Sequence, residues 1–584
     1  MRVLLLLFPL VLAAQQPFAT RCAGCHGDDA RGGAQAPGLA NNPRVAAQTV
    51  EQLRAYLEHG NPAAGMPAFA DVPAADLLNL ARYLRRINND TILPPPPAPA
   101  AKREWGAPQA GDWRTYNGSD SGNRHSPLKE ITTANVAALH LKWVFPLQYF
   151  GLETTPIAAD GVLYVTGPNQ VVALDVVTGS PLWQYSRPPS PGLSGDARLG
   201  TNRGVALLRD KLFFVTDNAH LLALDRSSGS VVWEKTLAPD MPGEHHEYGG
   251  TIAPLIVHDT VVAGVAGADH GIRGFVSAYQ AETGALAWRT WTVPRRGEPG
   301  IETWQGKEPI TGGGSTWLTG SYDAASDTLY WATGNPWPDS DDRDRPGDNL
   351  YTNCVLALDA RTGAIRWHYQ FTPHDVKDRD ATEPNVLVDT DYQGKPSKLL
   401  LHADRNGFFY VLDRTSGAVL LAKPFLRRVD WATAIKDGRP VVADPHGCPS
   451  DAANWDATAW SPATRLYYVM TLEECTGKPT AYPDQTGQRY LRALNIDTGE
   501  IAWEVAQPGA ARAKTWTGVL ATAGGLLFYG QPNGGFTAAD QRTGKTLWQF
   551  PTNVRMKAGP MTFTWAGKQY VAVAAGPNIL CFGL

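Results

Sequence analysis

The sequence predicts an all-β eight-bladed β-propeller that follows a small all-α N-terminal domain. Three observations support this fold class. An internal repeat recurs through most of the chain, glycine, proline and tryptophan are abundant (58, 45 and 19 of 584 residues), and helical patterns are scarce after the first ninety residues or so. Many turns, short strands and repeated tryptophans are typical of propellers, in which each repeat forms one blade. With 18% charged residues and a net charge of −4, the chain has no polybasic region that would indicate nucleic-acid binding.

The repeat consists of an apolar strand ending in Asp or a similar polar residue, two variable residues, Thr-Gly or Ser-Gly, and Trp eight residues after the Asp position. Complete copies occur at Asp175/Trp183, Asp225/Trp233, Gln280/Trp288, Asp359/Trp367, Asn495/Trp503 and Asp540/Trp548. Another copy begins at Asp413, with Leu421 at the Trp position, and Trp143 resembles the back half of an eighth. We expect Asp to bond the turn backbone, Gly to adopt positive φ and Trp to pack on a neighbouring strand. The incomplete first copy predicts that N- and C-terminal strands share one blade and close the ring.

Residues 1–14 are predicted to form a cleaved signal peptide. Arg2 supplies the charged start, and an apolar run ends in the small residues before Ala14. The alternative, a membrane anchor, would need roughly 20 apolar residues, and the run is shorter than that. Since no later segment is longer and as apolar, we expect a periplasmic or secreted protein with no transmembrane segment in its mature form.

The segment Cys22-Ala23-Gly24-Cys25-His26 has the pattern of a covalent haem attachment site. Its two thiols can bond to the two haem vinyl groups, and His26 can then bind the iron as the proximal ligand. The alternatives are a structural Cys pair or half of a zinc site. No second Cys pair lies nearby to complete a zinc site, so we predict haem c.

Met66, in the segment Gly65-Met66-Pro67, is the expected second iron ligand, and His59 is the alternative. A predicted helix over Ala74–Asn88 follows it. This order of features resembles class I cytochromes c, which implies a cytochrome c domain at residues 15–91.

A proline-rich linker is expected at residues 92–104, because a proline run can form neither helix nor a strand ladder. The propeller would then occupy residues 105–584. Within it, Cys448 and Cys475 flank a strand-like segment and are the best candidates for a disulfide bond in an oxidising compartment. The alternative is that all four propeller cysteines, the other two being Cys354 and Cys581, are buried free thiols.

The tryptophan repeat resembles that of the eight-bladed dehydrogenases that depend on pyrroloquinoline quinone (PQQ), including the methanol dehydrogenase group. The resemblance runs from about Trp113 to the C-terminus and includes strings such as Asn202-Arg203-Gly204-Val205, Thr333-Gly334-Asn335-Pro336 and Asp404-Arg405-Asn406-Gly407. It implies a PQQ in the central funnel, beside a Ca²⁺ or lanthanide ion. In that family the ion acts as a Lewis acid on the carbonyl that receives hydride.

The resemblance assigns the metal ligands to Asp269, Asn335 and Asp378, and the catalytic base to Asp378. Asp380 matches an added carboxylate that marks lanthanide-using members. These oxygen donors suit a hard cation, and a formal charge of −3 would offset a trivalent ion better than a divalent one. The alternative is that Asp378 and Asp380 belong to an ordinary solvated loop.

The resemblance also implies PQQ contacts from six residues: Arg203, Thr251, Trp317, Arg405, Asn454 and Trp516. Trp317 is expected to stack on the PQQ ring. The rigid guanidinium groups of Arg203 and Arg405 suit the carboxylate and quinone oxygens of the cofactor.

Three positions depart from the family pattern. Ala197-Arg198 replaces a pair of adjacent cysteines, Asp269 replaces Glu, and Lys377 replaces the Trp before the base. An ammonium group beside Asp378 is expected to lower the pKa of that carboxyl.

The combined features predict a quinohaemoprotein dehydrogenase that oxidises an alcohol, aldehyde or sugar at PQQ. Electrons would pass to the haem and then to an external acceptor, such as a soluble cytochrome or a respiratory chain. The alternative is a PQQ-less propeller scaffold or binding module that carries an electron-transfer cytochrome. A nicotinamide enzyme is disfavoured because no strand–GxGxxG–helix unit is present. The long insertions at about 290–350 and 425–490 are candidates for the rim that selects the substrate.

Overall fold

The computed structural model describes most of the chain: residues 18, 20–27, 30, 36, 38–40, 42, 45, 48–62, 65–88, 105–147, 149, 151–238, 247–449, 451–474, 487–508 and 517–584. The predicted signal peptide (1–14) and the proline-rich linker (92–104) lie outside these residues. The chain divides into two compact units. One comprises Met1–Pro97 with Ser186–Pro188, and the other comprises Ala98–Tyr185 with Pro189–Leu584. None of the helices in the described part is long and apolar enough to cross a membrane.

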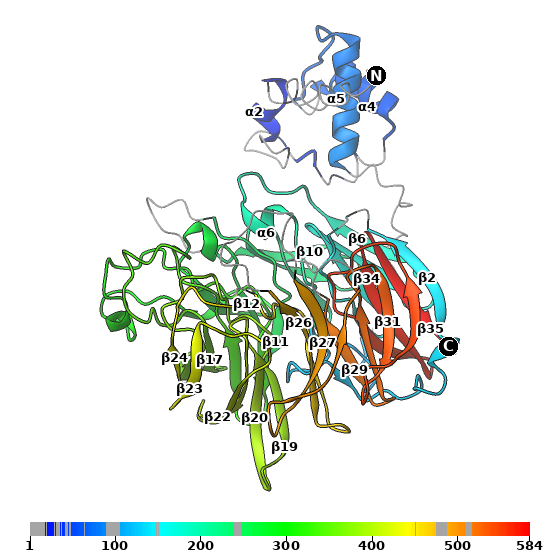
Figure 1. Ribbon diagram of the computed structural model, residues 1–584. Helices are drawn as coiled ribbons and strands as arrows, with labels where there is room; N and C mark the ends of the chain where they lie inside the picture. The colour runs from blue at the N-terminus through cyan, green and yellow to red at the C-terminus, as the bar shows by residue number, and fades with distance from the viewer. Residues whose placement is uncertain are drawn as a thin grey trace, which may run out of the picture. The chain divides into compact units, whose positions relative to one another are not determined.

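The N-terminal unit contains the helices α2 (Ala23–His26), α4 (Val50–His59) and α5 (Ala74–Ile87) (Figure 1). The helix predicted after Met66 is therefore confirmed to within one residue of its end. Thr49 starts α4 with a capping box, in which the Thr49 and Gln52 side chains each accept the other's backbone N–H. The helices enclose an apolar core that includes Phe18, Leu53, Leu57, Leu77, Leu80 and Leu84.

The second unit consists of eight four-stranded antiparallel blades, which confirms the predicted propeller. Four blades come from the first part of the chain: β3 (Ile157–Ala159), β4 (Val162–Gly167), β5 (Gln170–Asp175) and β6 (Pro181–Ser186); β7 (Ala206–Leu208), β8 (Lys211–Val215), β9 (His220–Asp225) and β10 (Val231–Thr236); β11 (Leu255–Val257), β12 (Thr260–Gly264), β13 (Phe275–Gln280) and β14 (Leu286–Trp291); β15 (Ser321–Asp323), β16 (Thr328–Ala332), β17 (Cys354–Asp359) and β18 (Ile365–Gln370).

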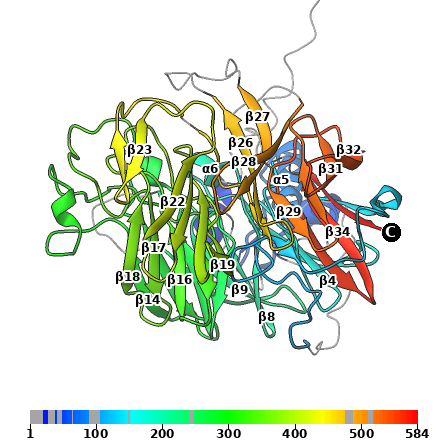
Figure 2. The same cartoon turned by 60° about the horizontal axis from the view of Figure 1, so that its bottom comes forward.

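The remaining blades follow in the same order: β19 (Val386–Tyr392), β20 (Lys395–Ala403), β21 (Phe408–Asp413) and β22 (Val419–Pro424); β25 (Ala459–Ser461), β26 (Leu466–Glu473), β27 (Gln488–Asn495) and β28 (Ile501–Ala506); β29 (Val519–Thr522), β30 (Leu526–Gly530), β31 (Gly535–Asp540) and β32 (Thr546–Pro551), with β1 (His125–Ser126) parallel to β29; and β33 (Met561–Trp565), β34 (Lys568–Ala575) and β35 (Asn578–Gly583) with β2 (His140–Pro146). In Figure 2 the blades succeed one another from green through yellow and orange to red.

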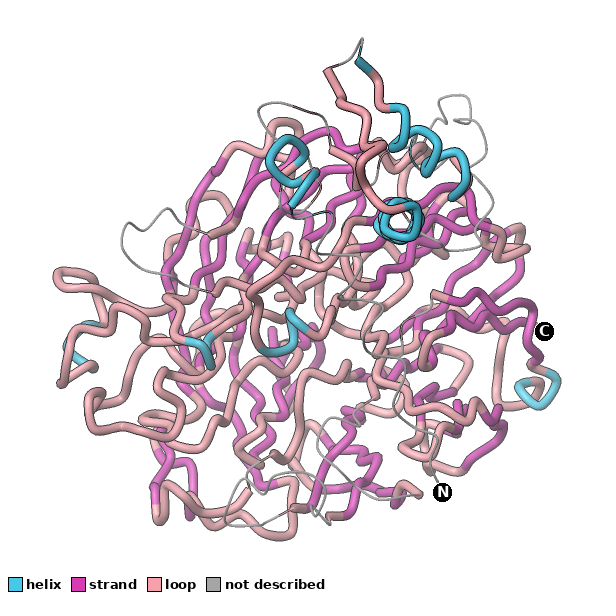
Figure 3. The backbone as a smooth tube through the Cα atoms, turned by 90° about the horizontal axis from the view of Figure 1, so that it is seen from above, coloured by secondary structure: helices cyan, strands magenta, loops and turns pink. Residues whose placement is uncertain are grey.

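Shorter elements fill the connections between blades. They are the hairpin β23 (Ala432–Lys436) and β24 (Arg439–Val442), the helix α6 (Gly195–Arg198) and the 3₁₀ turns η2 (Val136–Ala138), η3 (Ala268–His270) and η4 (Ile301–Thr303). Figure 3 shows these short helical turns (cyan) among the strands (magenta) and loops (pink).

One blade joins the two ends of the propeller sequence. Strand β2 pairs antiparallel with β35, from His140 opposite Gly583 to Pro146 opposite Asn578. In Figure 1, β2 (cyan) lies beside β35 (red). The predicted closure of the ring is therefore confirmed.

Six of the repeated tryptophans link their blade to the next one along the chain. Trp183 donates its indole N–H to the carbonyl of Arg226 at 3.0 Å, and its ring lies against Gly229, whose φ is +72°. The same indole-to-carbonyl contact occurs in the pairs Trp143–Val176, Trp233–Ala281, Trp288–Ala360, Trp503–Gln541 and Trp548–Leu139. Each hairpin also holds its own turn: the Asp175 carboxylate accepts the backbone N–H groups of Val177 and Thr178. The three predicted roles of Asp, Gly and Trp are thus observed.

The cysteines of the propeller fall into two groups. Cys448 is disulfide-bonded, whereas Cys354 and Cys581 are buried and free. Cys475, the partner predicted for Cys448, lies outside the described residues, so the Cys448–Cys475 pairing stays a prediction.

Candidate active site

One cavity of the propeller collects the site residues predicted from eight separate segments. It encloses about 1140 Å³, including the solvent at its open mouth. Nine of the ten predicted positions line it: Arg203, Thr251, Asp269, Trp317, Asn335, Asp378, Asp380, Arg405 and Asn454. The tenth, Trp516, lies outside the described residues.

The blade topology explains why these distant residues meet. In an antiparallel four-stranded blade, the start of strand one, the turn between strands two and three, and the end of strand four all lie at the same end. Thr251 and Trp317 precede the first strands β11 and β15, whereas Asn335 and Arg405 follow the second strands β16 and β20. Asp378 follows the fourth strand β18. All of them therefore face the same end of the propeller.

Asp378 and Asp380 are held around a single arginine. The Arg405 guanidinium lies 3.4 Å from one carboxylate oxygen of each, and its Nε lies 3.0 Å from Asp451. Asp380 also accepts the backbone N–H of Asn335 at 2.7 Å. The charge of −3 expected from the sequence counted the three carboxylates of the predicted metal ligands and left out Arg405. The positive charge of Arg405 offsets part of the negative charge of these carboxylates.

The carboxyl groups of the cavity are nevertheless short of positive charge. Burial, with some help from neighbouring carboxylates, raises the pKa of Asp380 to about 7, although Arg405 opposes the shift. The same causes raise the pKa of Asp269, and they raise the pKa of Asp378 well above its ordinary value. A cation among these oxygen atoms would replace the protons that the raised pKa values imply. The donor set, three carboxylates and the Asn335 amide, therefore fits a hard metal ion.

The expected effect of Lys377 on Asp378 is wrong. The Lys377 ammonium group donates hydrogen bonds to the carbonyls of His446 (2.6 Å) and Gly447 (2.9 Å). Its long side chain reaches a different segment, about 70 residues further along the chain. It is therefore not a principal influence on Asp378, whose pKa is raised by burial.

Arg203 forms the opposite side of the site. Its guanidinium lies 4.7 Å from the ring centres of both Trp317 and Trp455, and 2.8 Å from the Glu153 carboxylate. Arg203 is almost completely buried, whereas Trp317 is partly open to the cavity. A planar, anionic cofactor fits this combination, because aromatic rings offer a stacking surface and guanidinium a fixed set of donors.

Sequence reasoning missed several residues of the cavity wall, among them Glu153, Trp455 and Lys557. Glu153 bridges Arg203 and the Lys557 ammonium group, which lies 3.1 Å away. Its place just before strand β3, equivalent to that of Thr251 before β11, could have indicated it. Lys557 lies at the equivalent place, four residues before β33, and could have been indicated in the same way.

The two long insertions contribute Trp317, Asn335 and Asn454 to the cavity wall, and the segment Leu193–Ala197 lines another part of it. The role of the insertions in selecting the substrate stays a prediction. Ala197, at the position of the family's paired cysteines, belongs to the short helix α6. It packs closely against Gly249: a Cβ atom added to Gly249 would lie 2.6 Å from the Cβ atom of Ala197.

The haem motif lies on α2 in the N-terminal unit. Cys22 is buried in the apolar core, and Met66 packs against the same core. Two backbone hydrogen bonds of 3.0 Å between Asn61 and Met66 fix the Met66 loop. His59 is exposed to solvent, whereas Met66 packs against the core that holds Cys22, so the packing favours Met66 over His59 as iron ligand.

Comparisons with known proteins agree with this geometry. Residues 113–422 and 512–571 match the family described as glucose/ethanol/alcohol dehydrogenase, beta-propeller domain, of the PQQ type. Residues 10–84 match the family described as cytochrome c oxidase, cbb3-type, subunit III.

Individual relatives support the same assignment. The chain is 37% identical over 514 residues to quinohemoprotein alcohol dehydrogenase ADH IIB of Pseudomonas putida, covering 80% of this chain and 73% of that protein. It is 34% identical to the lanthanide-dependent methanol dehydrogenase of Methylacidiphilum fumariolicum, covering 80% of this chain and 85% of that protein. The solved structure of quinohemoprotein alcohol dehydrogenase ADHIIG from Pseudomonas putida superposes with a TM-score of 0.73 at 31% identity, covering 82% of this chain and 80% of the other. The chain therefore belongs to the PQQ-dependent alcohol dehydrogenase family and carries a cytochrome domain at its N-terminal end.

Proposed function

We propose that this protein is a periplasmic quinohaemoprotein dehydrogenase that oxidises a small alcohol, aldehyde or sugar and transfers the electrons to its own haem c. The observation that carries the proposal is the convergence of nine predicted site residues on one cavity. A propeller that served only as a scaffold would not need these residues to meet. The name of the Pseudomonas putida relative, a quinohemoprotein alcohol dehydrogenase, supports the same activity.

Five residues would hold PQQ in the cavity: Arg203, Thr251, Trp317, Arg405 and Asn454. When bound, PQQ supplies the acceptor for the hydride and the two electrons that leave the alcohol. Trp317 would support the ring. The two guanidinium groups, fixed by Glu153 and by the aspartates around Arg405, would orient the cofactor's oxygens.

Asp269, Asn335, Asp378 and Asp380 would hold the metal ion. Their oxygen atoms suit Ca²⁺ or a lanthanide, and similarity to a lanthanide-dependent methanol dehydrogenase supports the latter. Since Arg405 supplies one positive charge, the four groups and the arginine carry a formal charge nearer −2 than −3. We therefore propose that both ions bind and that Asp380 shifts the preference toward the trivalent one.

Asp378 would take the proton of the substrate hydroxyl. Its side chain is 40% exposed, so a substrate hydroxyl can reach it. The salt bridge to Arg405 would hold the carboxylate in position. Lys377 points elsewhere and leaves the base free to accept the proton.

The haem would accept electrons one at a time. Cys22 and Cys25 would attach it, and His26 and Met66 would bind the iron, a ligand pair that favours a raised reduction potential. From the haem, electrons would pass to an external acceptor such as a soluble cytochrome or a respiratory chain. The predicted signal peptide, residues 1–14, supports export to the periplasm, where haem attachment and the Cys448 disulfide are compatible.

Haem reduction by alcohol tests the proposal. The full-length protein, loaded with haem, PQQ and Ca²⁺ or La³⁺, is mixed with a panel of alcohols, and the haem absorbance is followed by stopped flow. Asp378→Asn should slow alcohol-dependent haem reduction about 10²- to 10⁴-fold, the usual contribution of a general base.

Asp437→Asn is the matched control for this experiment. Asp437 also has a positive φ (+49°, against +55° for Asp378), but it is exposed and does not line the cavity. Asparagine tolerates this conformation as aspartate does. Haem reduction that is equally fast in wild type and Asp378→Asn, or that does not require PQQ, would contradict the proposal.

A further inference from the structure

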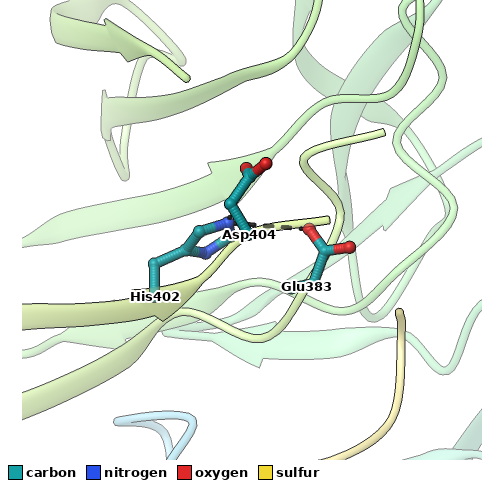
Figure 4. Close-up of side chains that lie close together, drawn as sticks. All are labelled: Glu383, His402 and Asp404. Atoms are coloured by element: carbon teal, nitrogen blue, oxygen red, sulfur yellow. Dashed lines mark hydrogen bonds and ion pairs between the residues drawn. The ribbon is translucent and has the colours of Figure 1, made fainter. Parts of the chain in front are cut away.

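A second cluster of metal-type ligands lies outside the cavity. Figure 4 shows Glu383, His402 and Asp404 facing one another, and none of the three lines the PQQ cavity. All three are buried, with exposed fractions of 2%, 0% and 0%. They come from different segments: Glu383 from the loop before β19, His402 from β20, and Asp404 from the turn that follows β20.

The ligand atoms are close enough to share one ion. His402 Nε2 lies 3.2 Å from Asp404 Oδ2 and 3.6 Å from Glu383 Oε2, and all three atoms lie within 4.8 Å of one another. A tetrahedral zinc ion with bonds of about 2.0–2.1 Å separates its ligand atoms by about 3.3 Å. The two measured separations bracket that value.

His402 directs one ring nitrogen at the two carboxylates. Its Nδ1 lies 3.0 Å from the Asn385 amide oxygen, which can only accept a hydrogen bond, so Nδ1 carries a hydrogen. Its Nε2 lies within hydrogen-bond distance of Asp404 Oδ2 and is the ring atom that would bind an ion. A ring nitrogen on the metal, with the other ring N–H donated to a nearby oxygen, is the usual arrangement of a histidine ligand.

Glu383 provides an independent observation. Neither oxygen of its carboxylate has a hydrogen-bond partner, although the side chain is almost completely buried. Arg405, the cation in its neighbourhood, is already engaged by Asp378, Asp380 and Asp451. A buried carboxylate without partners is strongly unfavourable, and a bound cation would remove this penalty.

We propose that Glu383, His402 and Asp404 bind a divalent first-row transition-metal ion, with Zn²⁺ as the best fit. One imidazole nitrogen and two carboxylate oxygens suit zinc, whereas Ca²⁺ and Mg²⁺ prefer sites made of oxygen alone. Asp404 Oδ1 accepts the backbone N–H of Asn406 at 2.8 Å, which leaves Oδ2 for the ion. The Phe371 ring stacks on His402 at 4.2 Å and closes one side of the site to water.

This second metal site has a structural role. Glu383 follows Asp380 in the same loop, and Asp404 directly precedes Arg405. An ion shared by Glu383 and Asp404 therefore ties together the two segments that carry the Asp380–Arg405 pair of the cavity. The ion would position these residues without touching the substrate.

Elemental analysis of the purified full-length holoprotein tests the proposal. The protein is produced with added Zn²⁺, passed through gel filtration and analysed by mass spectrometry, with the haem iron as the reference for one chain. We expect one zinc per iron in the wild type and a decrease of about tenfold or more in Glu383→Gln.

Glu234→Gln is the matched control. Glu234 also faces a histidine, with 2.6 Å between its carboxylate and His220 Nδ1, but both side chains are partly exposed. Its zinc content should equal that of the wild type. Two results would overturn the proposal: wild-type protein without zinc, or Glu383→Gln protein that retains it. Wild-type protein without zinc would mean that the cluster holds a proton instead of a metal ion.

Anomalous diffraction of wild-type crystals at the zinc absorption edge keeps the test decisive if Glu383→Gln does not fold. A peak among Glu383, His402 and Asp404 would support the site. No peak there, with zinc in the medium, would refute it.

Discussion

Replacing Gly229 by alanine should destabilise the propeller more than the same change at a glycine with equal backbone strain and no neighbour. Gly229 has φ +72°, and a Cβ there would lie 2.4 Å from Cε3 of Trp183. Gly394 has φ +79°, and nothing lies within 4 Å of the position of its Cβ. The two substitutions therefore share the backbone effect and differ in contact with the tryptophan.

The magnitude follows from these contacts. Alanine in the left-handed region costs about 1–2 kcal/mol at either position. At Gly229 the Trp183 ring must also move, which adds about 1–3 kcal/mol of overpacking and puts at risk a hydrogen bond of about 1 kcal/mol to Arg226. For a unit as large as the propeller, each kcal/mol shifts Tm by about 1 °C. We expect Gly394→Ala to lower Tm by about 1–2 °C and Gly229→Ala by about 3–6 °C.

Thermal unfolding at one fixed scan rate, followed by tryptophan fluorescence, provides the assay. The fixed rate keeps the comparison valid if unfolding is irreversible. Equal decreases in Tm for the two variants would show that the tryptophan contact between blades adds no stability, and the reasoning would then be refuted.

Three further predictions concern the two cofactor sites. The pKa of Asp380 is about 7 in the folded, metal-free protein and about 4 in the unfolded chain. The folded state therefore binds this proton more tightly, and the free energy of unfolding decreases as pH rises between those two values. Tm of the metal-free protein should fall from pH 5 to pH 8, and it should fall less in Asp380→Asn. Met66→Ala should lower the haem reduction potential in a redox titration, whereas His59→Ala should leave it unchanged. Glu153→Gln leaves Arg203 with a buried, unpaired charge, so the free energy of unfolding measured at equilibrium should decrease by about 3–5 kcal/mol. A decrease below about 1 kcal/mol, which is typical of a surface ion pair, would contradict this prediction.

Local patterns were sufficient to predict the propeller but not its contacts between blades. The Asp, Gly and Trp positions of each hairpin lie within nine residues, so their spacing is visible in the sequence. The carbonyl that accepts the Trp183 N–H lies 43 residues further along the chain, and no local pattern indicates it. The number of blades followed from counting repeats, and the closing pair of β2 and β35 followed from the incomplete first copy.

The active site was predictable where a family motif marks each residue. Asp269, Asn335 and Arg405 lie in recognisable strings, and antiparallel blade topology brings such strings to one end of the fold. Side-chain direction was not predictable. Lys377 is next to Asp378 in the sequence but donates hydrogen bonds to carbonyl groups about 70 residues away. The partner of a long, flexible side chain depends on the tertiary structure around it, which the local sequence does not give.

The central claim is that the cavity holds PQQ together with a metal ion. Titration of the haem-loaded, full-length protein with PQQ, in the presence of Ca²⁺ and of La³⁺ separately, tests it most directly. We predict binding close to one PQQ per haem that requires the cation, and weaker La³⁺-dependent binding in Asp380→Ala. No PQQ binding with either ion, in protein whose haem content and fold are intact, would contradict the account.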